Sequence, residues 1–241
     1  MQVTTRGIVI HHIKYSEKSV IAKVYTEKFG LQSYLVHGVR NARSKNKAAY
    51  LQPLSLIEVN AIHKEKKGLQ SVKSISLTSS YASIPFHIVK SSIAFFLAEI
   101  LHKTIKEEEP NEALFEFLFH GFQLLDLSGE ECVNFHLVFM GKLCKYLGIE
   151  PGKPSQSPGE FYFDLRESCF LVFPPAHNDY LPADLSAFFI AIMSTSLNDL
   201  NLSLSNSVRK QLLKAFIDYY HLHLSNFGNL KSLPVLEEVL H

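Results

Sequence analysis

The hydrophobic pattern of this chain changes its period near residue 80, and this change limits the possible folds more than any other feature. Before it, apolar and polar residues alternate in short runs that are separated by turn residues, as in β-strands. After it, apolar residues recur three and four positions apart, as on one face of an α-helix. The pattern predicts an α+β chain, with a β domain over residues 1–80 and a mainly helical domain over residues 81–241.

Five strands are expected in the first domain. They cover residues 7–13, 19–26, 31–39, 54–62 and 69–79. Gly30 closes the turn before the third strand, because glycine tolerates the positive φ that such turns need. Five short strands at this spacing indicate a small barrel, and the OB-fold is the five-stranded barrel that binds oligonucleotides. Counting strands does not distinguish it from an SH3-like barrel.

Helices are expected in the second domain, with a small β-hairpin inserted among them. The apolar stripes indicate helices at about residues 85–105, 110–125, 129–147, 182–197 and 206–220. Pro85 suits the first turn of the first helix, and Ser205 or Asn206 caps the fifth. The stretch 151–159 is rich in Pro, Gly and Ser and reads as a loop, after which residues 161–173 form the hairpin.

Charge is divided unevenly between the two domains. Residues 1–80 contain thirteen Lys and Arg against four acids, a balance of +9. The remainder contains eleven against nineteen, a balance of −8, so the net charge of +1 conceals the difference. A basic domain joined to an acidic one suggests that the first binds a polyanion.

Positive charge is most concentrated in residues 38–47, the basic segment. It holds Arg40, Arg43, Lys45 and Lys47 and no acid, and it lies between two predicted strands, where a rigid scaffold would present it. Lys and Arg contact phosphates, while Asn and Ser between them can add hydrogen bonds. We expect the segment to bind a nucleic-acid backbone; the alternative is a solvated charge run.

Other residues of the first domain extend the expected surface. Some are lysines that would add positive charge, and two are tyrosines that would stack on bases at about 1–3 kcal/mol each. These further candidates are Lys23, Tyr25, Tyr34, Lys66 and Lys67. For the two tyrosines, packing within the barrel is an equally good alternative.

The sequence contains no recognisable catalytic or metal-binding pattern. Cys132, Cys144 and Cys169 are too far apart for a CxxC-type site, and such cysteine usage fits a reducing compartment. No Gly-rich phosphate loop, GxSxG or HExxH occurs. With neither a signal peptide nor an apolar run of about 20 residues, we expect a cytoplasmic protein without cofactor, metal or membrane anchor.

Several motifs occur in a distinctive order and spacing over most of the chain. They are Gly7-Ile8-Val9-Ile10, Tyr15-Ser16-Glu17-Lys18-Ser19, Tyr25-Thr26-Glu27-Lys28-Phe29-Gly30, His37-Gly38-Val39-Arg40 with Lys45, Leu51-Gln52-Pro53-Leu54, Leu143-Cys144-Lys145-Tyr146-Leu147-Gly148 with Pro151, and His223 with Leu230-Lys231-Ser232-Leu233. Together they resemble the RecO family of bacterial DNA repair and recombination mediators.

The resemblance implies an OB domain followed by a helical domain, in many members with an inserted four-cysteine zinc module. It implies a non-enzymatic protein that binds single- and double-stranded DNA and anneals complementary strands. With RecR, such a protein helps to load the recombinase RecA on strands coated by single-stranded DNA-binding protein, in the cytoplasm at the nucleoid. The zinc module would fall at about residues 151–180, where Cys169 is the one cysteine. We therefore expect no zinc, and a hairpin in its place.

The resemblance also implies a second partner, the acidic C-terminal tail of single-stranded DNA-binding protein. A groove edged by cations would suit such a tail, and the candidates are Lys142, Lys145 and Arg209; ordinary surface positions are the alternative. Two other functions stay open. One is an OB-type RNA-binding protein, which would prefer structured RNA. The other is a hydrolase with a histidine-centred site, for which no motif is present.

Overall fold

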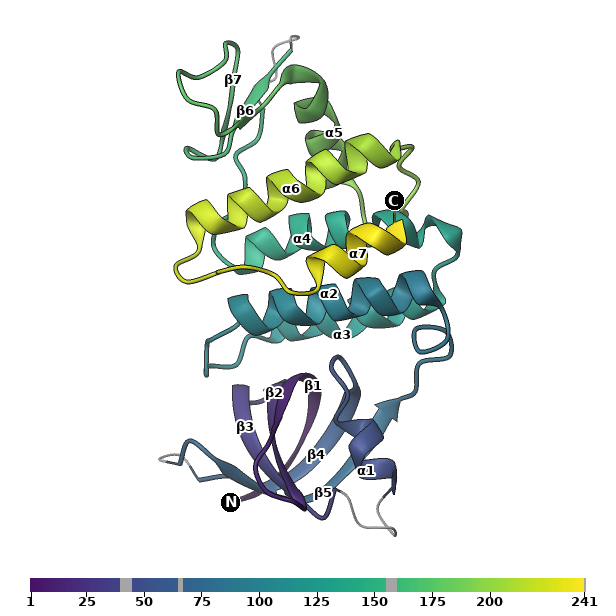
Figure 1. The fold of residues 1–241 in the computed structure, drawn as a ribbon. Helices are drawn as coiled ribbons and strands as arrows, with labels where there is room; N and C mark the ends of the chain where they lie inside the picture. The colour runs from purple at the N-terminus through teal and green to yellow at the C-terminus, as the bar shows by residue number, and fades with distance from the viewer. Residues whose placement is uncertain (40–44, 65–66, 155–159, 241) are drawn as a thin grey trace. The chain divides into compact units, whose positions relative to one another are not determined.

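Five strands at the N-terminus close into a barrel (Figure 1). The computed structural model describes residues 1–39, 45–64, 67–154 and 160–240. The strands of the barrel are β1 (Gln2–Lys14), β2 (Ser19–Thr26), β3 (Gly30–His37), β4 (Leu56–Ile62) and β5 (Gln70–Ser79). They are hydrogen-bonded in the order β1-β2-β3-β5-β4, and β3 with β5 is the parallel pair. This arrangement confirms the predicted five-stranded barrel of the OB type.

The long strand β1 closes the barrel by pairing with two other strands. Its first half pairs with β4 and its second half with β2, both antiparallel. The register with β2 shifts between Val9 and His11, which marks a bulge. Because a bulge bends a strand and increases its twist, β1 can follow the curve of the barrel from one neighbour to the other.

Alternate residues of the strands fill the barrel interior. The buried cluster consists of Val9, Ala22, Val24, Tyr34, Val36, Val39, Leu51, Ile57, Val59 and Ala61. Leu51 reaches this cluster directly after α1 (Lys45–Tyr50), a short helix between β3 and β4. The hydrophobic period does not predict α1, because six residues make fewer than two turns and show almost no periodicity.

The chain separates into two compact units. Unit 1 contains Met1–His87 and Ala94–Leu127, and thus the barrel, the later part of α2 (Ile88–Thr104) and α3 (Glu112–Leu127). Unit 2 contains Ile88–Ile93 and Ser128–His241. Its elements after the start of α2 are the 3-10 helix η2 (Glu130–Asn134), α4 (Phe135–Tyr146), β6 (Tyr162–Asp164), β7 (Cys169–Leu171), β8 (Tyr180–Leu181), α5 (Ala183–Ser194), α6 (Asn206–His223) and α7 (Leu233–Leu240).

Arg6 on β1 ties the barrel to α3 within unit 1. Its Nε and Nη2 donate to the carboxylate of Glu27 at 3.0 and 2.8 Å, and Nη2 also pairs with Glu116 of α3. The guanidinium carbon lies 5.1 Å and 5.0 Å from the ring centroids of Phe115 and Phe119. The planar guanidinium suits this combination of bidentate pairing and stacking. The hydrogen bond from Arg6 holds the pKa of Glu27 below its ordinary value.

The predicted hairpin is present in unit 2 as β6 and β7, and β8 adds a third strand on the other edge of β6. The ring of Phe163 is fully buried and stacks on Phe189 at 4.5 Å between centroids. His223 of α6 adds a hydrogen bond of 2.7 Å to the carbonyl oxygen of Leu165. Within the described ranges, no three His, Cys, Asp or Glu residues are grouped to hold a metal ion.

The predicted helices are present with shifted ends. Pro85 lies outside α2, contrary to the prediction, because the carboxylate of Asp126 holds the preceding segment as a turn. It accepts hydrogen bonds of 2.8 Å from each of three backbone N–H groups, those of Ala82, Ser83 and Ile84. Ser205 caps α6, as predicted. Among the helices that the structure describes, none has the length and apolar character needed to cross a bilayer.

Candidate nucleic-acid interface

The turn between β1 and β2 lies beside the end of β3. The backbone N–H of Val39 donates to the carbonyl oxygen of Lys18 at 3.1 Å. The hydroxyl oxygen of Ser19 is 2.9 Å from Nδ1 of His37, its cross-strand partner. These contacts place Lys18 next to the point where the basic segment 38–47 begins.

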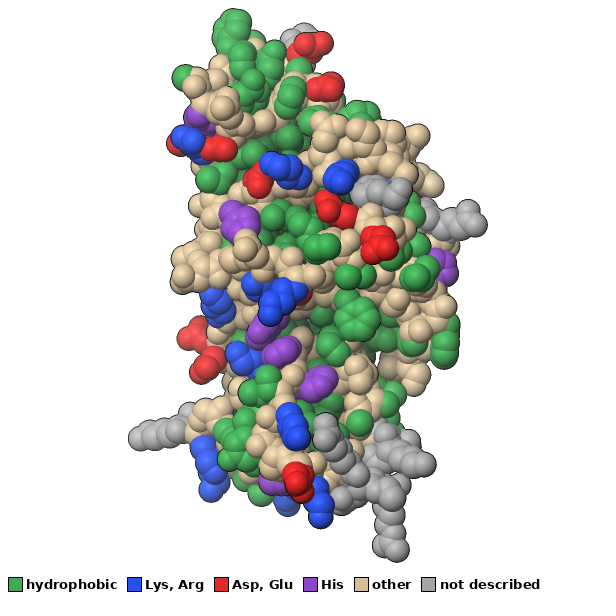
Figure 2. Space-filling model, viewed as in Figure 1, with side chains coloured by type: hydrophobic (Ala, Val, Ile, Leu, Met, Phe, Trp, Pro, Cys, Tyr) green, Lys and Arg blue, Asp and Glu red, His purple; other side chains and the backbone are tan. Residues whose placement is uncertain are grey.

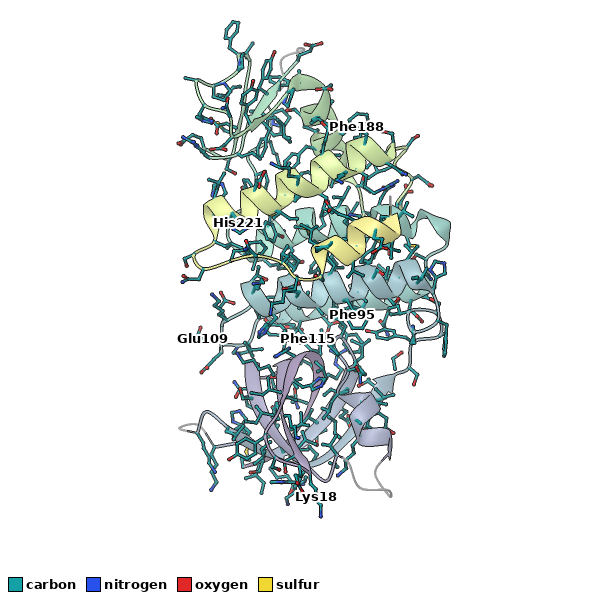
Figure 3. All side chains as sticks on the ribbon, in the orientation of Figure 1. Lys18, Phe95, Glu109, Phe115, Phe188 and His221 are labelled. Carbon is teal, nitrogen blue, oxygen red and sulfur yellow. The ribbon has the colours of Figure 1, made fainter. Side chains whose placement is uncertain are left out.

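Cationic and aromatic side chains gather at this junction, and we call Lys14, Tyr15, Lys18 and Lys47 the tip surface. The first three are exposed, and the Tyr15 residue is 60% exposed. Nζ of Lys47 lies 3.5 Å from the carbonyl oxygen of His37, a long contact that leaves the ammonium able to reach a ligand. Glu17 places one acid in the same turn. Several basic side chains are exposed on this part of the visible face in Figure 2. Figure 3 shows Lys18 at the end of the barrel away from Phe115.

Sequence patterns do not single out Lys14, Tyr15 and Lys18 as binding residues, although residues 15–18 are recognisable as a turn. A usable signal exists, because the loop between the first two strands is one of those through which OB-folds bind oligonucleotides. The pairing of Ser19 with His37 then brings that loop to the basic segment, and pairing register is a property of the folded sheet.

The basic segment is described only in part. Arg40 and Arg43 lie outside the described residues, as does Lys66, so their roles stay predictions from sequence. Lys45 begins α1, and Lys47 belongs to the same helix. Of the four cations predicted in the basic segment, Lys47 is thus the one that the described residues place in the tip surface.

Lys23 lies on the outer face of β2, one of the two strands whose outer face binds ligands in OB-folds. Its cross-strand neighbours are His11 on β1 and Ser33 on β3. Its side chain is exposed, as a phosphate-binding residue requires.

Tyr25 and Tyr34 do not present rings for base stacking, so the prediction that they would is wrong and the packing alternative holds. Tyr34 is 1% exposed within the barrel cluster, and burial raises its pKa to about 12. Tyr25 points to the opposite face from Val24, but its ring packs on Phe115 of α3 at 6.5 Å between centroids and the residue is 0% exposed. A base could reach either ring only by displacing α3 or the barrel core.

A separate open groove of about 480 Å³ lies in unit 1 beside the β2–β3 and β4–β5 turns. The ring of Phe29 stacks there on His63, with 3.9 Å between centroids. Lys67, one of the predicted binding residues, also lines the groove, but so do Glu108 and Glu109. Because its charges are mixed, we do not assign the nucleic-acid backbone to this groove.

Arg209 is a structural residue of unit 2, and the prediction that it edges a partner groove is wrong. It is 6% exposed. Its Nε donates to Oδ1 of Asn134 at 3.0 Å, and its Nη1 donates to Oδ1 of Asn206 at 2.7 Å. Nη2 adds a bond of 3.2 Å to the carbonyl oxygen of Leu204. These bonds engage the guanidinium inside the protein, where an acidic peptide has no access to it.

The two other predicted partner residues, Lys142 and Lys145, differ in their exposure to solvent. Lys142 is half-buried, and its Nζ donates to the carbonyl oxygen of Met193 at 2.6 Å. Burial also lowers the pKa of Lys142. Lys145 is exposed at the end of α4. Of these two lysines, Lys145 is the better placed to meet an acidic partner.

Two family models match nearly the whole chain: Recombination protein O N terminal over residues 1–81, and Recombination protein O C terminal over residues 85–234. The DNA repair protein RecO of Flavobacterium psychrophilum is 38% identical over 242 residues, which cover 99% of both chains. The RecO proteins of Bacteroides fragilis and Flavobacterium johnsoniae are each 37% identical, with coverage of 98% and 99% of both chains respectively. The OB-type barrel, the helical part that follows it and these matches agree: the chain belongs to the RecO family of DNA repair proteins.

Proposed function

We propose that this chain is a non-enzymatic DNA-binding mediator of recombinational repair, which binds single- and double-stranded DNA and anneals complementary strands. The observation that carries the proposal is the tip surface, where exposed lysines of the β1–β2 turn adjoin the basic segment on an OB-type barrel. Contacts to phosphates supply most of the affinity in sequence-independent DNA binding.

The composition of this surface favours capture of the backbone over recognition of bases. Lys14, Lys18 and Lys47 offer three ammonium groups for phosphates against one exposed ring, that of Tyr15, while Tyr25 and Tyr34 are buried and offer no stacking surface. A protein that holds a strand by its phosphates leaves the base edges free to pair. Two strands held in this way are brought to a high local concentration while their base edges stay accessible. Both effects would accelerate annealing.

Protein partners complete the proposal. As a RecO-family member, the chain would act with RecR to help load a recombinase on strands coated by single-stranded DNA-binding protein. The acidic C-terminal tail of that protein would bind in the helical part, where Lys145 is exposed. Recombinase loading would take place in the cytoplasm, at the nucleoid.

Annealing tests this function directly. The protein is expected to accelerate the pairing of two complementary labelled oligonucleotides, without ATP, and to leave both strands intact on a denaturing gel. The physical reason is local concentration of strands on cationic sites. Stopped-flow fluorescence measures the rate, with non-complementary strands as the control. An unchanged rate at protein concentrations that saturate the strands, or cleavage of either strand, would contradict the proposal.

A further inference from the structure

Two histidines of unit 1 that lie far apart in the sequence stack on each other beside a lysine. The ring of His11 on β1 lies against the ring of His102 in the last turn of α2, with 4.4 Å between centroids and 28° between planes. Lys23 is the cross-strand neighbour of His11 on the adjacent strand. Histidine side chains lie beside lysine or arginine side chains over the barrel and the adjoining helices in Figure 2.

The ring nitrogens of this pair are available to a ligand. Both histidines are half-buried, and among the described residues neither ring donates or accepts a hydrogen bond. Three nitrogen-bearing side chains from β1, β2 and α2 thus lie together outside the barrel interior, with Lys23 exposed beside the stacked rings. The strand face that includes β2 is one through which OB-folds bind oligonucleotides.

The surroundings of both rings disfavour their protonated form in the free protein. Burial lowers the pKa of His11, and the charges of His12 and Lys23 lower it further. Burial likewise lowers the pKa of His102, with contributions from His11, Lys23 and Lys103, against which Glu99 acts in the opposite direction. A second positive charge in the stack is therefore unfavourable unless an anion compensates it.

We propose that His11, His102 and Lys23 form a binding site for a phosphodiester group of DNA, and that this site takes up protons when DNA binds. A bound phosphate would offset both the burial of the imidazoliums and their mutual repulsion. The C-terminal end of α2 also favours a cation at His102. This inference rests on the proposed DNA-binding function and adds a second phosphate contact region to the tip surface.

Linkage fixes the sign of the pH dependence. DNA raises the pKa of the two rings, so the complex carries more protons than the free components at pH values between the pKa of the free rings and that of the bound rings. Affinity must then increase as the pH falls. An average uptake of about half a proton between about pH 8 and about pH 6 corresponds to about tenfold tighter binding at the lower pH.

The test is fluorescence anisotropy with a labelled single-stranded oligonucleotide at constant ionic strength over this pH range. Wild type is expected to show the tenfold change. The variant H11Q/H102Q is expected to lose the change with pH, because glutamine keeps polarity without titrating. The variant H87Q, at an exposed histidine of the same unit, should retain it.

Calorimetry supplies a measurement that depends on no variant. Titration of wild type with the oligonucleotide near pH 6.5, in two buffers of different ionisation enthalpy, is expected to show net proton uptake. Binding without uptake, or full pH dependence in a folded H11Q/H102Q variant, would overturn the proposal and leave DNA binding intact. No DNA binding at any pH in dilute salt would instead refute the proposed function itself.

Discussion

Replacement of Lys14, Lys18 and Lys47 by Glu is expected to weaken single-stranded DNA binding about 100-fold in dilute salt. Each lysine is placed to make a charge-assisted contact with a phosphate, and such a contact contributes about 1 kcal/mol or more. Three lost contacts amount to about 3 kcal/mol, which is about two powers of ten in the dissociation constant. Anisotropy with a labelled oligonucleotide measures the effect, and circular dichroism checks the fold.

A matched control separates a local site from a general effect of charge. Lys145, Lys153 and Lys210 are exposed residues of unit 2, and their replacement by Glu changes the net charge by the same amount. This control is expected to change the affinity by less than about threefold, because it alters the net charge without removing a phosphate contact of the tip surface. Equal losses in the two triple variants would mean that the tip surface is not a specific binding region.

Gly30→Ala is expected to lower the free energy of unfolding by about 3 kcal/mol. Gly30 has φ of +62°, which costs a non-glycine residue about 1 kcal/mol. A methyl group there would also lie 2.3 Å from the carbonyl oxygen of Glu109. The neighbouring N–H of Leu31 donates to the carbonyl oxygen of Glu107 at 3.0 Å, so the two segments cannot separate without losing this bond. Overpacking of this kind typically costs about 1–3 kcal/mol more.

Gly148→Ala provides the comparison, and urea denaturation measures the free energy of unfolding of both variants. Gly148 has a similar φ of +72°, but an added Cβ would meet nothing within 4 Å. Only the backbone cost of about 1 kcal/mol is therefore expected. The difference between the two variants isolates the packing of the β2–β3 turn on the segment before α3. Equal destabilisation would show that this close approach is absent in solution.

The barrel could be predicted from the sequence because its strands are short runs rich in β-branched residues and their turns contain recognisable residues. The strand β2, for example, has the predicted ends, Ser19 and Thr26. Short elements could not be predicted in this way. The helix α1 has six residues and β8 has two, and both depend on tertiary contacts instead of a local pattern.

Side-chain roles depended on information that a single sequence does not contain. Alternation shows that Tyr25 faces away from the barrel interior, but not that α3 covers that face. Composition identifies Arg209 as a cation, but not that Asn134 and Asn206 engage it. A single sequence does not reveal the tip surface either, because Lys18 comes next to the basic segment only through the pairing of β2 with β3.

Capture of DNA by the basic barrel is proposed to depend on phosphate contacts, with the basic segment at their centre. Single-stranded DNA affinity across a salt series, measured for wild type and for a folded R40E/R43E variant, tests this proposal. Contact with five phosphates predicts that log affinity falls with log salt at a slope of about −3.5, and loss of two contacts reduces the slope to about −2. Affinity that is independent of salt, or a variant that keeps both the affinity and the slope of wild type, would contradict this proposal.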